Sequence, residues 1–231
     1  MRIALIADLH GNKTALSAFE KDIKSRNVDS LWCLGDLVGK GPSSDYTFDW
    51  AIANCDVILR GNWDEDLGNR VFAADEYYFN QLGDKRLETL LTFPVEKHMY
   101  IAGKKLRLLH GRPSMDMPFF IQEEEKKLSA LFEPDFNIVG YADIHRQALR
   151  TLNCGLLFNV GSIGNSLGIV RVQYAILTAD EGMEDGAINV ELINLPYDIQ
   201  HEIDSIPLDF PYAENYIQEL TYGVYARKPK L

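Results

Sequence analysis

Residues 1–12 read MRIALIADLHGN, and this stretch decides the class of fold. The apolar run at residues 3–7 has the length of a strand, and its lack of alternation is typical of a strand covered on both faces. The run leads directly to Asp8 and His10. Apolar side chains at helical spacing follow in residues 14–26, with Asn12 or Thr14 as the expected N-cap.

The alternation of strands and helices continues along the chain. Residues 30–34 and 57–59 predict two further buried strands. Between them, Ser43 and Ser44 precede a predicted helix that runs through Ala53. This order indicates right-handed crossover connections and a mainly parallel sheet. Later residues predict a strand at 137–141, hairpins at 97–109, 148–160 and 173–193, and helices at 76–91, 123–132 and 213–220, with an interruption at Gly83.

These elements predict an α/β fold in which mixed sheets pack on each other and helices lie outside. We expect a single domain over residues 1–231. Within it, residues 66–100 are expected to form a helical, cap-like insertion, and residues 170–231 a C-terminal hairpin and helix.

Composition excludes several classes of function. The net charge of −11 and the isoelectric point near 4.9 argue against extended nucleic-acid binding, which depends on cationic side chains. The apolar run at residues 3–7 is too short for a signal peptide or a membrane span, so we expect no membrane association. The chain has three cysteines, Cys33, Cys55 and Cys154, an odd number without a CxxC spacing. This pattern is typical of free thiols and predicts a cytoplasmic protein.

Five segments place metal-binding side chain types directly after short apolar runs. They are Asp8-Leu9-His10, Gly35-Asp36, Gly61-Asn62, Leu109-His110 and Asp143-Ile144-His145. Asp, His and Asn form a mixed oxygen and nitrogen ligand set, which suits manganese, iron or zinc. Ligands in such folds gather at the carboxyl ends of the strands, where all of these segments are expected to lie.

The number of ligands predicts two divalent ions. Asp36 has two carboxylate oxygens and can bridge two ions, so the seven side chains supply four ligands to each ion. Two ions roughly 3.5–4 Å apart stabilise the attacking and leaving oxygens at phosphorus and generate hydroxide at neutral pH. Manganese is the expected ion, with iron, zinc or magnesium as alternatives.

The order of these motifs resembles that of the calcineurin-like metallophosphoesterase superfamily over residues 1 to about 165. The motifs that carry the resemblance are Asp8-x-His10, Gly35-Asp36, Gly61-Asn62, His110-Gly111 and Ile144-His145. The NVGSIG segment at residues 159–164 is similar to a segment of its small bacterial and archaeal members, which include phosphodiesterases. The resemblance implies a four-layer α-β-β-α sandwich with a dinuclear site at the strand ends. It implies that Asp8, His10, Asp36 and His145 hold one ion, and that Asp36, Asn62, His110 and residue 143 hold the other.

Three residues depart from the pattern of that superfamily. Asp143 stands where a histidine is usual, and we expect it to ligate and to favour manganese; its alternative is a turn cap. Trp63 stands where many members have a histidine, and an indole cannot act as a general acid. Trp63 is therefore expected to line the pocket or to stack on a nucleobase. Val160 replaces a proline, and no consequence is expected.

Further residues are candidates for contacts with the substrate. Asn12, Asp36, Asn62 and His110 are expected to take part in catalysis, although Asn12 could serve only as a helix cap. Lys40, Arg60 and Arg112 neighbour the ligand segments and are candidates to bind phosphate.

Together these features predict a metal-dependent phosphoesterase that hydrolyses phosphomonoesters or phosphodiesters by attack of a metal-bound hydroxide. The expected substrate is a small phosphorylated molecule or a nucleotide, including a dinucleoside polyphosphate. The alternative is a non-catalytic interaction scaffold, which Trp63 and Asp143 favour. The near-complete ligand set opposes the scaffold, because buried carboxylates are costly without cations. The acidic charge disfavours a DNA nuclease.

Overall fold

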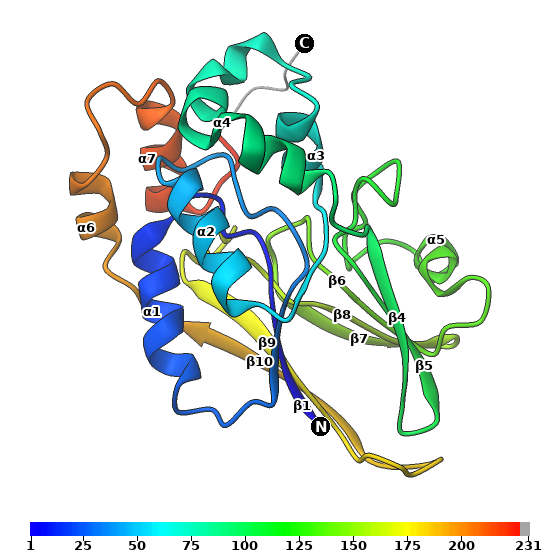
Figure 1. Cartoon of the computed structure of the whole chain (residues 1–231). Helices are drawn as coiled ribbons and strands as arrows, with labels where there is room; N and C mark the ends of the chain where they lie inside the picture. Colours follow the sequence, from blue (N-terminus) through cyan, green and yellow to red (C-terminus); the bar gives the residue numbers. More distant parts are fainter. Residues whose placement is uncertain (227–231) are drawn as a thin grey trace.

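The computed structural model describes residues 1–226 and contains two five-stranded sheets (Figure 1). The first sheet has the order β10 (Ile188–Leu195), β9 (Val172–Ala179), β1 (Arg2–Ile6), β2 (Ser30–Cys33), β3 (Val57–Ile58). The second has the order β4 (Glu96–Ile101), β5 (Lys104–Leu109), β6 (Ile138–Tyr141), β8 (Gly155–Asn159), β7 (Ala148–Leu152). The helices are α1 (Lys13–Ile23), α2 (Ser44–Asn54), α3 (Asn62–Gly68), α4 (Glu76–Leu90), α5 (Glu125–Leu128), α6 (Ile199–Asp204) and α7 (Ala213–Tyr222), with 3₁₀ turns at Ala73–Asp75 and Ser129–Phe132.

Each sheet has parallel strands at its centre. Strands β1, β2 and β3 run parallel, with Leu5 opposite Trp32 and Cys33 opposite Ile58. Strands β5, β6 and β8 also run parallel, whereas β4, β7, β9 and β10 pair in the antiparallel direction. The carboxyl ends of β1, β2 and β3 therefore share one edge of the first sheet, and those of β5 and β6 share one edge of the second.

The facing sides of the two sheets form an apolar layer. Leu5 and Leu34 from the first sheet belong to the same buried cluster as Leu106, Leu108 and Phe158 from the second. Removing a side chain such as Leu5 from water contributes about 1.5–3 kcal/mol, and this layer fixes the position of one sheet against the other.

Helices cover the outer faces. The outer side of the first sheet packs against α1, α2, α4 and α7, where the ring of Phe19 lies edge-on against Tyr174, with centroids 5.0 Å apart. The outer side of the second sheet packs against α5 and the neighbouring 3₁₀ turn through Leu128, Leu131 and Phe132 (Figure 1). The predicted four-layer α-β-β-α sandwich is confirmed.

The structure differs from the predicted elements in three places. Residues 66–100 are helical only in part, because β4 begins at Glu96 and pairs with β5. Residues 123–132 form one short helix followed by a 3₁₀ turn. Helix α6 was not expected, and residues 227–231 of the predicted C-terminal segment lie outside the described part of the chain. The interruption at Gly83 is confirmed by its φ of 68°. Between residues 1 and 226, no helix combines the length and apolarity needed to cross a membrane.

Candidate metal centre

The ends of five strands bring the predicted ligands to one place. Asp8 and His10 follow β1, Asp36 follows β2, and Asn62 begins α3 after β3. From the second sheet, His110 follows β5, and Asp143 and His145 follow β6. The loop after β8 connects the ligand segments of the two sheets. In this loop, the backbone N–H of Gly164 and the hydroxyl of Ser162 both donate to the backbone carbonyl of Asp8.

The backbone bends sharply at most of these ligands. Five of them have a positive φ, in the left-handed region: Asp8 at 55°, His10 at 46°, Asp36 at 55°, Asp143 at 65° and His145 at 55°. Non-glycine residues reach this region at a cost, and Asp, Asn and His reach it more readily than others. Such strain gathers where a side chain must be aimed at a functional site.

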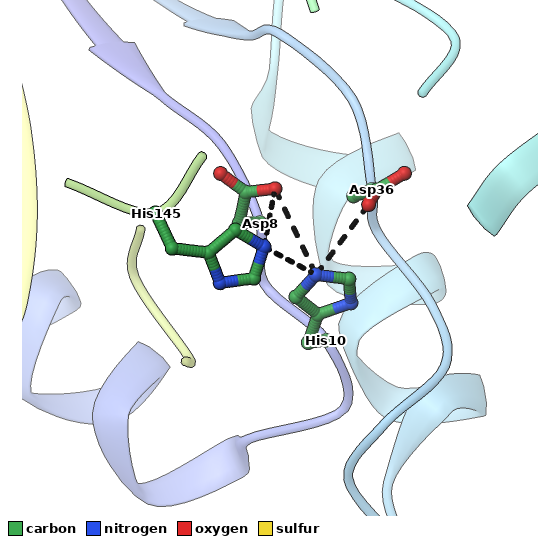
Figure 2. A group of neighbouring side chains, drawn as sticks. All are labelled: Asp8, His10, Asp36 and His145. Atoms are coloured by element: carbon green, nitrogen blue, oxygen red, sulfur yellow. Dashed lines mark hydrogen bonds and ion pairs between the residues drawn. The ribbon is translucent and has the colours of Figure 1, made fainter. Parts of the chain in front are cut away.

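Four of the side chains form a compact cluster (Figure 2). One possible ligand atom from each of Asp8, His10, Asp36 and His145 lies within 4.8 Å of the others, and all four residues are buried. The Nε2 atom of His10 lies 3.4 Å from Oδ2 of Asp36 and 3.2 Å from Nε2 of His145. The Nε2 atom of His145 lies 3.3 Å from Oδ1 of Asp8. These are the residues that the resemblance assigns to one ion.

Backbone carbonyls determine which nitrogen of each histidine faces the cluster. The Nδ1 atom of His10 faces the carbonyl of Val38 at 3.0 Å, that of His110 the carbonyl of Leu34 at 2.9 Å, and that of His145 the carbonyl of Asn165 at 2.5 Å. A carbonyl only accepts, so Nδ1 carries the proton and donates in each ring. In the neutral rings, Nε2 is then a lone pair aimed at the cluster, as metal-binding histidines require.

Several buried atoms lack a hydrogen-bond partner among the described residues. They include both carboxylate oxygens of Asp8, Oδ1 of Asn62 and Nε2 of His110. Burying a carboxylate or an amide oxygen without a partner is unfavourable, and a cation between these atoms would remove the cost. The donor set therefore fits divalent ions that take oxygen and imidazole nitrogen ligands.

The electrostatics of the metal-free centre are unfavourable. Burial raises the pKa of Asp8, and burial together with the charge of Lys40 lowers the pKa values of His10 and His145. Burial alone would lower the pKa of His110, but the carboxylates of Asp36, Asp8 and Asp143 outweigh burial and raise it to about 10. A bound cation would reverse the shifts of Asp8 and His110 and would keep His10 and His145 neutral, because it favours ionised carboxylates and neutral imidazoles.

Asp36 lies between the two groups of ligands. Its Oδ2 atom is 3.4 Å from Nε2 of His10 and 3.4 Å from Nε2 of His110, as expected for a bridging carboxylate. Its Oδ1 atom accepts a hydrogen bond from the backbone of Trp63 at 2.8 Å. That bond fixes the carboxylate while leaving Oδ2 directed at both histidines.

Asp64 supports the centre and was missed by the sequence analysis. Its buried carboxylate accepts hydrogen bonds from the backbone N–H groups of Asp36, Leu37 and Gly61, at 2.8–2.9 Å. Burial and the charge of Asp36 raise the pKa of Asp64 to about 7. Its position three residues after Gly61, in the first turn of α3, is the capping-box spacing and was the available signal.

Asp143 is held by Arg112. The guanidinium donates from Nη2 to Oδ1 at 2.6 Å and from Nε to Oδ2 at 3.0 Å. Asp143 lies against Gly111, the residue after His110: a Cβ on Gly111 would come within 2.7 Å of the Cβ of Asp143, and the charge of Asp143 acts on His110. The predicted ligand is therefore near the second group, but both of its oxygens are paired with an arginine.

Two other predicted residues, Asn12 and Arg60, have structural contacts. Asn12 is sealed from solvent and caps α1: its oxygen accepts from the backbone of Ala15, and its amide donates to the carbonyl of Gly164 and to the hydroxyl of Tyr197. The structure thus favours the cap over the expected phosphoryl contact. Arg60 is directed away from the cluster, since it donates to the carbonyl of Leu91 and pairs with Glu65.

Trp63 packs beneath the cluster. It is 9% exposed, and its ring lies edge-on against His10, with centroids 5.8 Å apart. Gly39 allows this packing, because a Cβ at that position would lie 2.2 Å from Cε3 of Trp63. The indole therefore holds the ring of His10 in place, and little of the indole surface remains to stack on a nucleobase.

Lys40 brings a buried positive charge to the edge of the centre. Its ammonium group donates to Oδ1 of Asn165 at 3.0 Å and lies 5.1 Å from the centre of the Tyr225 ring. The amide of Asn165 in turn donates to the buried Glu219 at 2.9 Å. The charge of Lys40 acts on His10 and His145, so this cation lies within electrostatic range of the cluster.

The two sheets and the cluster at their edges define a protein of the metallophosphoesterase type. The chain matches the model of the calcineurin-like phosphoesterase superfamily domain over residues 1–182, and it belongs to this superfamily. The resemblance seen in the sequence is thereby confirmed.

Several known proteins are similar to this chain at low identity, in sequence or in structure. An uncharacterized protein of Methanocaldococcus jannaschii is 24% identical over 227 residues, which cover 88% of this chain and 91% of the relative. A metallophosphoesterase of Sphaerobacter thermophilus is similar in structure with a TM-score of 0.73 and 22% identity, covering 97% of this chain and 99% of the other. A hypothetical protein of Pyrococcus horikoshii gives a TM-score of 0.76 at 18% identity with the same coverage. Zinc-complexed Vps29 of Entamoeba histolytica is more distant, with a TM-score of 0.53 at 15% identity, covering 84% of this chain and 99% of that protein.

Proposed function

We propose that this protein is a metal-dependent phosphoesterase that hydrolyses small phosphomonoesters or phosphodiesters. Nucleotides, including dinucleoside polyphosphates, are the favoured substrates, and manganese is the favoured ion. The observation that carries the proposal is the buried cluster of Asp8, His10, Asp36 and His145. Beside it lie Oδ1 of Asn62, which lacks a hydrogen-bond partner among the described residues, and Nε2 of His110, which is 3.4 Å from Oδ2 of Asp36. Such a set is costly without cations, and it lies where two sheets expose their carboxyl ends.

The side chains would hold two ions. Asp8, His10, Asp36 and His145 would hold one, and Asp36, Asn62 and His110 would hold the other, with Asp143 as its remaining ligand. When bound, two divalent ions stabilise charge on the phosphoryl oxygens and lower the pKa of water, which is the chemistry needed for in-line displacement.

Two cationic side chains flank this set and would orient the substrate. Lys40 is buried, and Arg112 exposes 39% of its side chain at the mouth of the centre. An arginine presents paired N–H donors that match the geometry of a phosphate group. These charges would make the field at the centre locally more favourable to an anionic substrate, although the whole chain carries a net charge of −11.

The packing of Trp63 restricts the leaving group. Its indole N–H cannot protonate a leaving oxygen, and the ring is committed to contacts with His10 and Tyr78. Substrates whose leaving group is stable without protonation are therefore favoured. Aryl phosphates and phosphoanhydrides, such as dinucleoside polyphosphates, meet this condition better than alkyl esters.

The test is hydrolysis of p-nitrophenyl phosphate, bis(p-nitrophenyl) phosphate and a diadenosine polyphosphate with manganese, iron, zinc or magnesium. Asp36→Ala should lower kcat by about two orders of magnitude or more, because it removes the bridging ligand. His98→Ala is the control, since His98 is exposed and pairs with Glu96 outside the centre. Absence of turnover with every combination of ion and substrate would contradict the proposal.

A non-catalytic scaffold is the second candidate function. The observation that favours it is the pairing of Asp143 with Arg112, which occupies one expected ligand. A protein that binds manganese tightly but turns over none of these substrates would support this candidate over the enzyme.

A cytoplasmic location belongs to the same proposal. Cys33, Cys55 and Cys154 are unpaired, and burial raises the pKa of Cys33 above its usual range, so this thiol stays protonated and unreactive. Free thiols of this kind fit a reducing compartment.

A further inference from the structure

We propose that Arg112 regulates assembly of the second metal position by holding Asp143, and that a phosphate group releases Asp143 by taking its place on the guanidinium. This inference rests on the proposed function of the same site. In it, the first position is complete in the resting protein, and the second becomes complete only when a phosphate-bearing ligand arrives.

The two ligand groups differ in how closely their ligand atoms are already assembled. The atoms of Asp8, His10, Asp36 and His145 already lie within 4.8 Å of one another. In the second group, His110 Nε2 lies 3.4 Å from Asp36 Oδ2, and Asn62 Oδ1 is buried and unpaired. The remaining ligand of that group is bound to an arginine instead of pointing freely at its neighbours.

The pairing of Arg112 with Asp143 is unusual in this chain. In the other arginine–carboxylate ion pairs of residues 1–226, the carboxylate side chains are 20–83% exposed. The Asp143 side chain is 2% exposed, whereas that of Arg112 is 39% exposed. The carboxylate of Asp143 is thus buried, whereas the side chain of Arg112 stays partly exposed, so a ligand in solvent can reach it.

Arg112 opposes a second cation in two ways. Its Nε and Nη2 groups take one lone pair from each oxygen of Asp143, and its positive charge repels an ion at the neighbouring position. The charge of Asp143 meanwhile acts on His110 and on Asp8, so the carboxylate is within electrostatic range of both ligand groups. Removal of the guanidinium should therefore tighten binding at the second position.

A phosphate group is the natural competitor for Arg112. It offers the same paired oxygens as a carboxylate and carries more charge, so it can replace Asp143 on the guanidinium. The freed carboxylate can then complete the set of Asp36, Asn62 and His110. The ligand that needs two ions for reaction would in this way help to assemble the position for the second.

The test measures manganese binding to the whole chain, without turnover. Titration calorimetry gives the affinities, and electron paramagnetic resonance distinguishes an isolated manganese ion from a coupled pair. The variants are Arg112→Met, which keeps the aliphatic stem, Asp143→Asn, and Arg86→Met as a matched control that breaks a surface pair with Asp49. Inorganic phosphate is the probe ligand.

The wild-type protein should bind one ion tightly and the second at least about tenfold more weakly, and phosphate should tighten the second, since hydrogen bonds to charged groups contribute on this scale. Arg112→Met should tighten the second ion by a similar factor with no phosphate present. Arg86→Met should match the wild type. Asp143→Asn should lose the second ion with or without phosphate.

Two ions of equal affinity in the phosphate-free wild type would overturn the inference, as would an Arg112→Met variant whose second affinity is unchanged. Retention of the coupled signal in Asp143→Asn would also overturn it. These results leave the proposed function standing, because the first ion still binds. If manganese did not bind at all, the proposed function itself would fail.

Discussion

The Nε2 atoms of His10 and His145 lie 3.2 Å apart, and the opposite nitrogen of each ring donates to a backbone carbonyl. Two lone pairs therefore face each other in a buried space. Without a cation this arrangement is repulsive, and the surrounding backbone holds it in place. The resulting preorganisation is typical of sites that bind an ion tightly.

Manganese should therefore stabilise the protein against unfolding. A ligand present at a hundred times its Kd stabilises the native state by about 2.7 kcal/mol, which corresponds to a rise in Tm of about 5–10 °C for a chain of this size. Thermal unfolding with manganese and then with excess chelator measures the effect. The rise should be smaller in His145→Ala and unchanged in His98→Ala, and an unchanged Tm in the wild type would contradict the prediction.

Metal binding should release a proton from His110. The pKa of His110 in the metal-free protein is raised to about 10, so the ring carries a proton at pH 7 that must leave before Nε2 can bind an ion. Affinity should accordingly rise with pH between about 7 and 9. Calorimetry in buffers with different ionisation enthalpies counts the protons released, and His110→Asn should release about one fewer. Affinity that does not change with pH would argue against a protonated His110.

Asp64→Asn should weaken both the fold and the centre. An amide offers one acceptor oxygen where the carboxylate now serves three N–H groups, so at least one buried donor loses its partner. We expect destabilisation of about 2–4 kcal/mol in urea unfolding and a drop of about 10–100-fold in metal affinity. Asp84→Asn is the control, because the side chain of Asp84 is 83% exposed and its pair with Arg70 lies at the surface. Equal stability of the two variants would show that Asp64 is not a support of the centre.

Gly39→Ala should displace Trp63. The added Cβ would lie 2.2 Å from the indole, and the φ of 82° adds strain. Gly83→Ala is a matched control with a φ of 68° and no atom within 4 Å of the new Cβ, so it carries strain without a clash. We expect a loss of about 1 kcal/mol for Gly83→Ala and about 2–4 kcal/mol for Gly39→Ala, with a change in tryptophan fluorescence in the latter alone. Similar losses and spectra in both variants would rule out the contact with Trp63.

The rate of hydrolysis should depend steeply on the leaving group. Since Trp63 cannot donate a proton, activity on a series of aryl phosphates should fall as the pKa of the leaving phenol rises. The measurement is kcat/KM for esters of phenols that differ in acidity. A flat dependence would indicate a proton donor that Trp63 does not provide.

The sequence predicted the strands and the meeting of Asp8, His10, Asp36 and His145, because each of these side chains follows shortly after the end of a strand. The run that ends at Asp8 and the Gly35-Asp36 step identify strand ends without knowledge of the fold. The partner of Asp143 was not predictable in the same way, because Arg112 lies 31 residues earlier and meets it only through the pairing of β5 with β6. The burial of Asn12 likewise depends on Tyr197 and Gly164, which approach α1 only in the folded chain.

The left-handed turns at Asp8, His10, Asp36, Asp143 and His145 limit how this centre can be altered by mutation. A residue introduced at one of these positions must both ligate the ion and adopt a positive φ, and β-branched side chains do not tolerate a positive φ. Asn, Asp, His and Gly tolerate it. Efforts to change the metal preference of this scaffold would therefore begin with exchanges among these residues, and a library restricted to them would contain a larger share of folded variants.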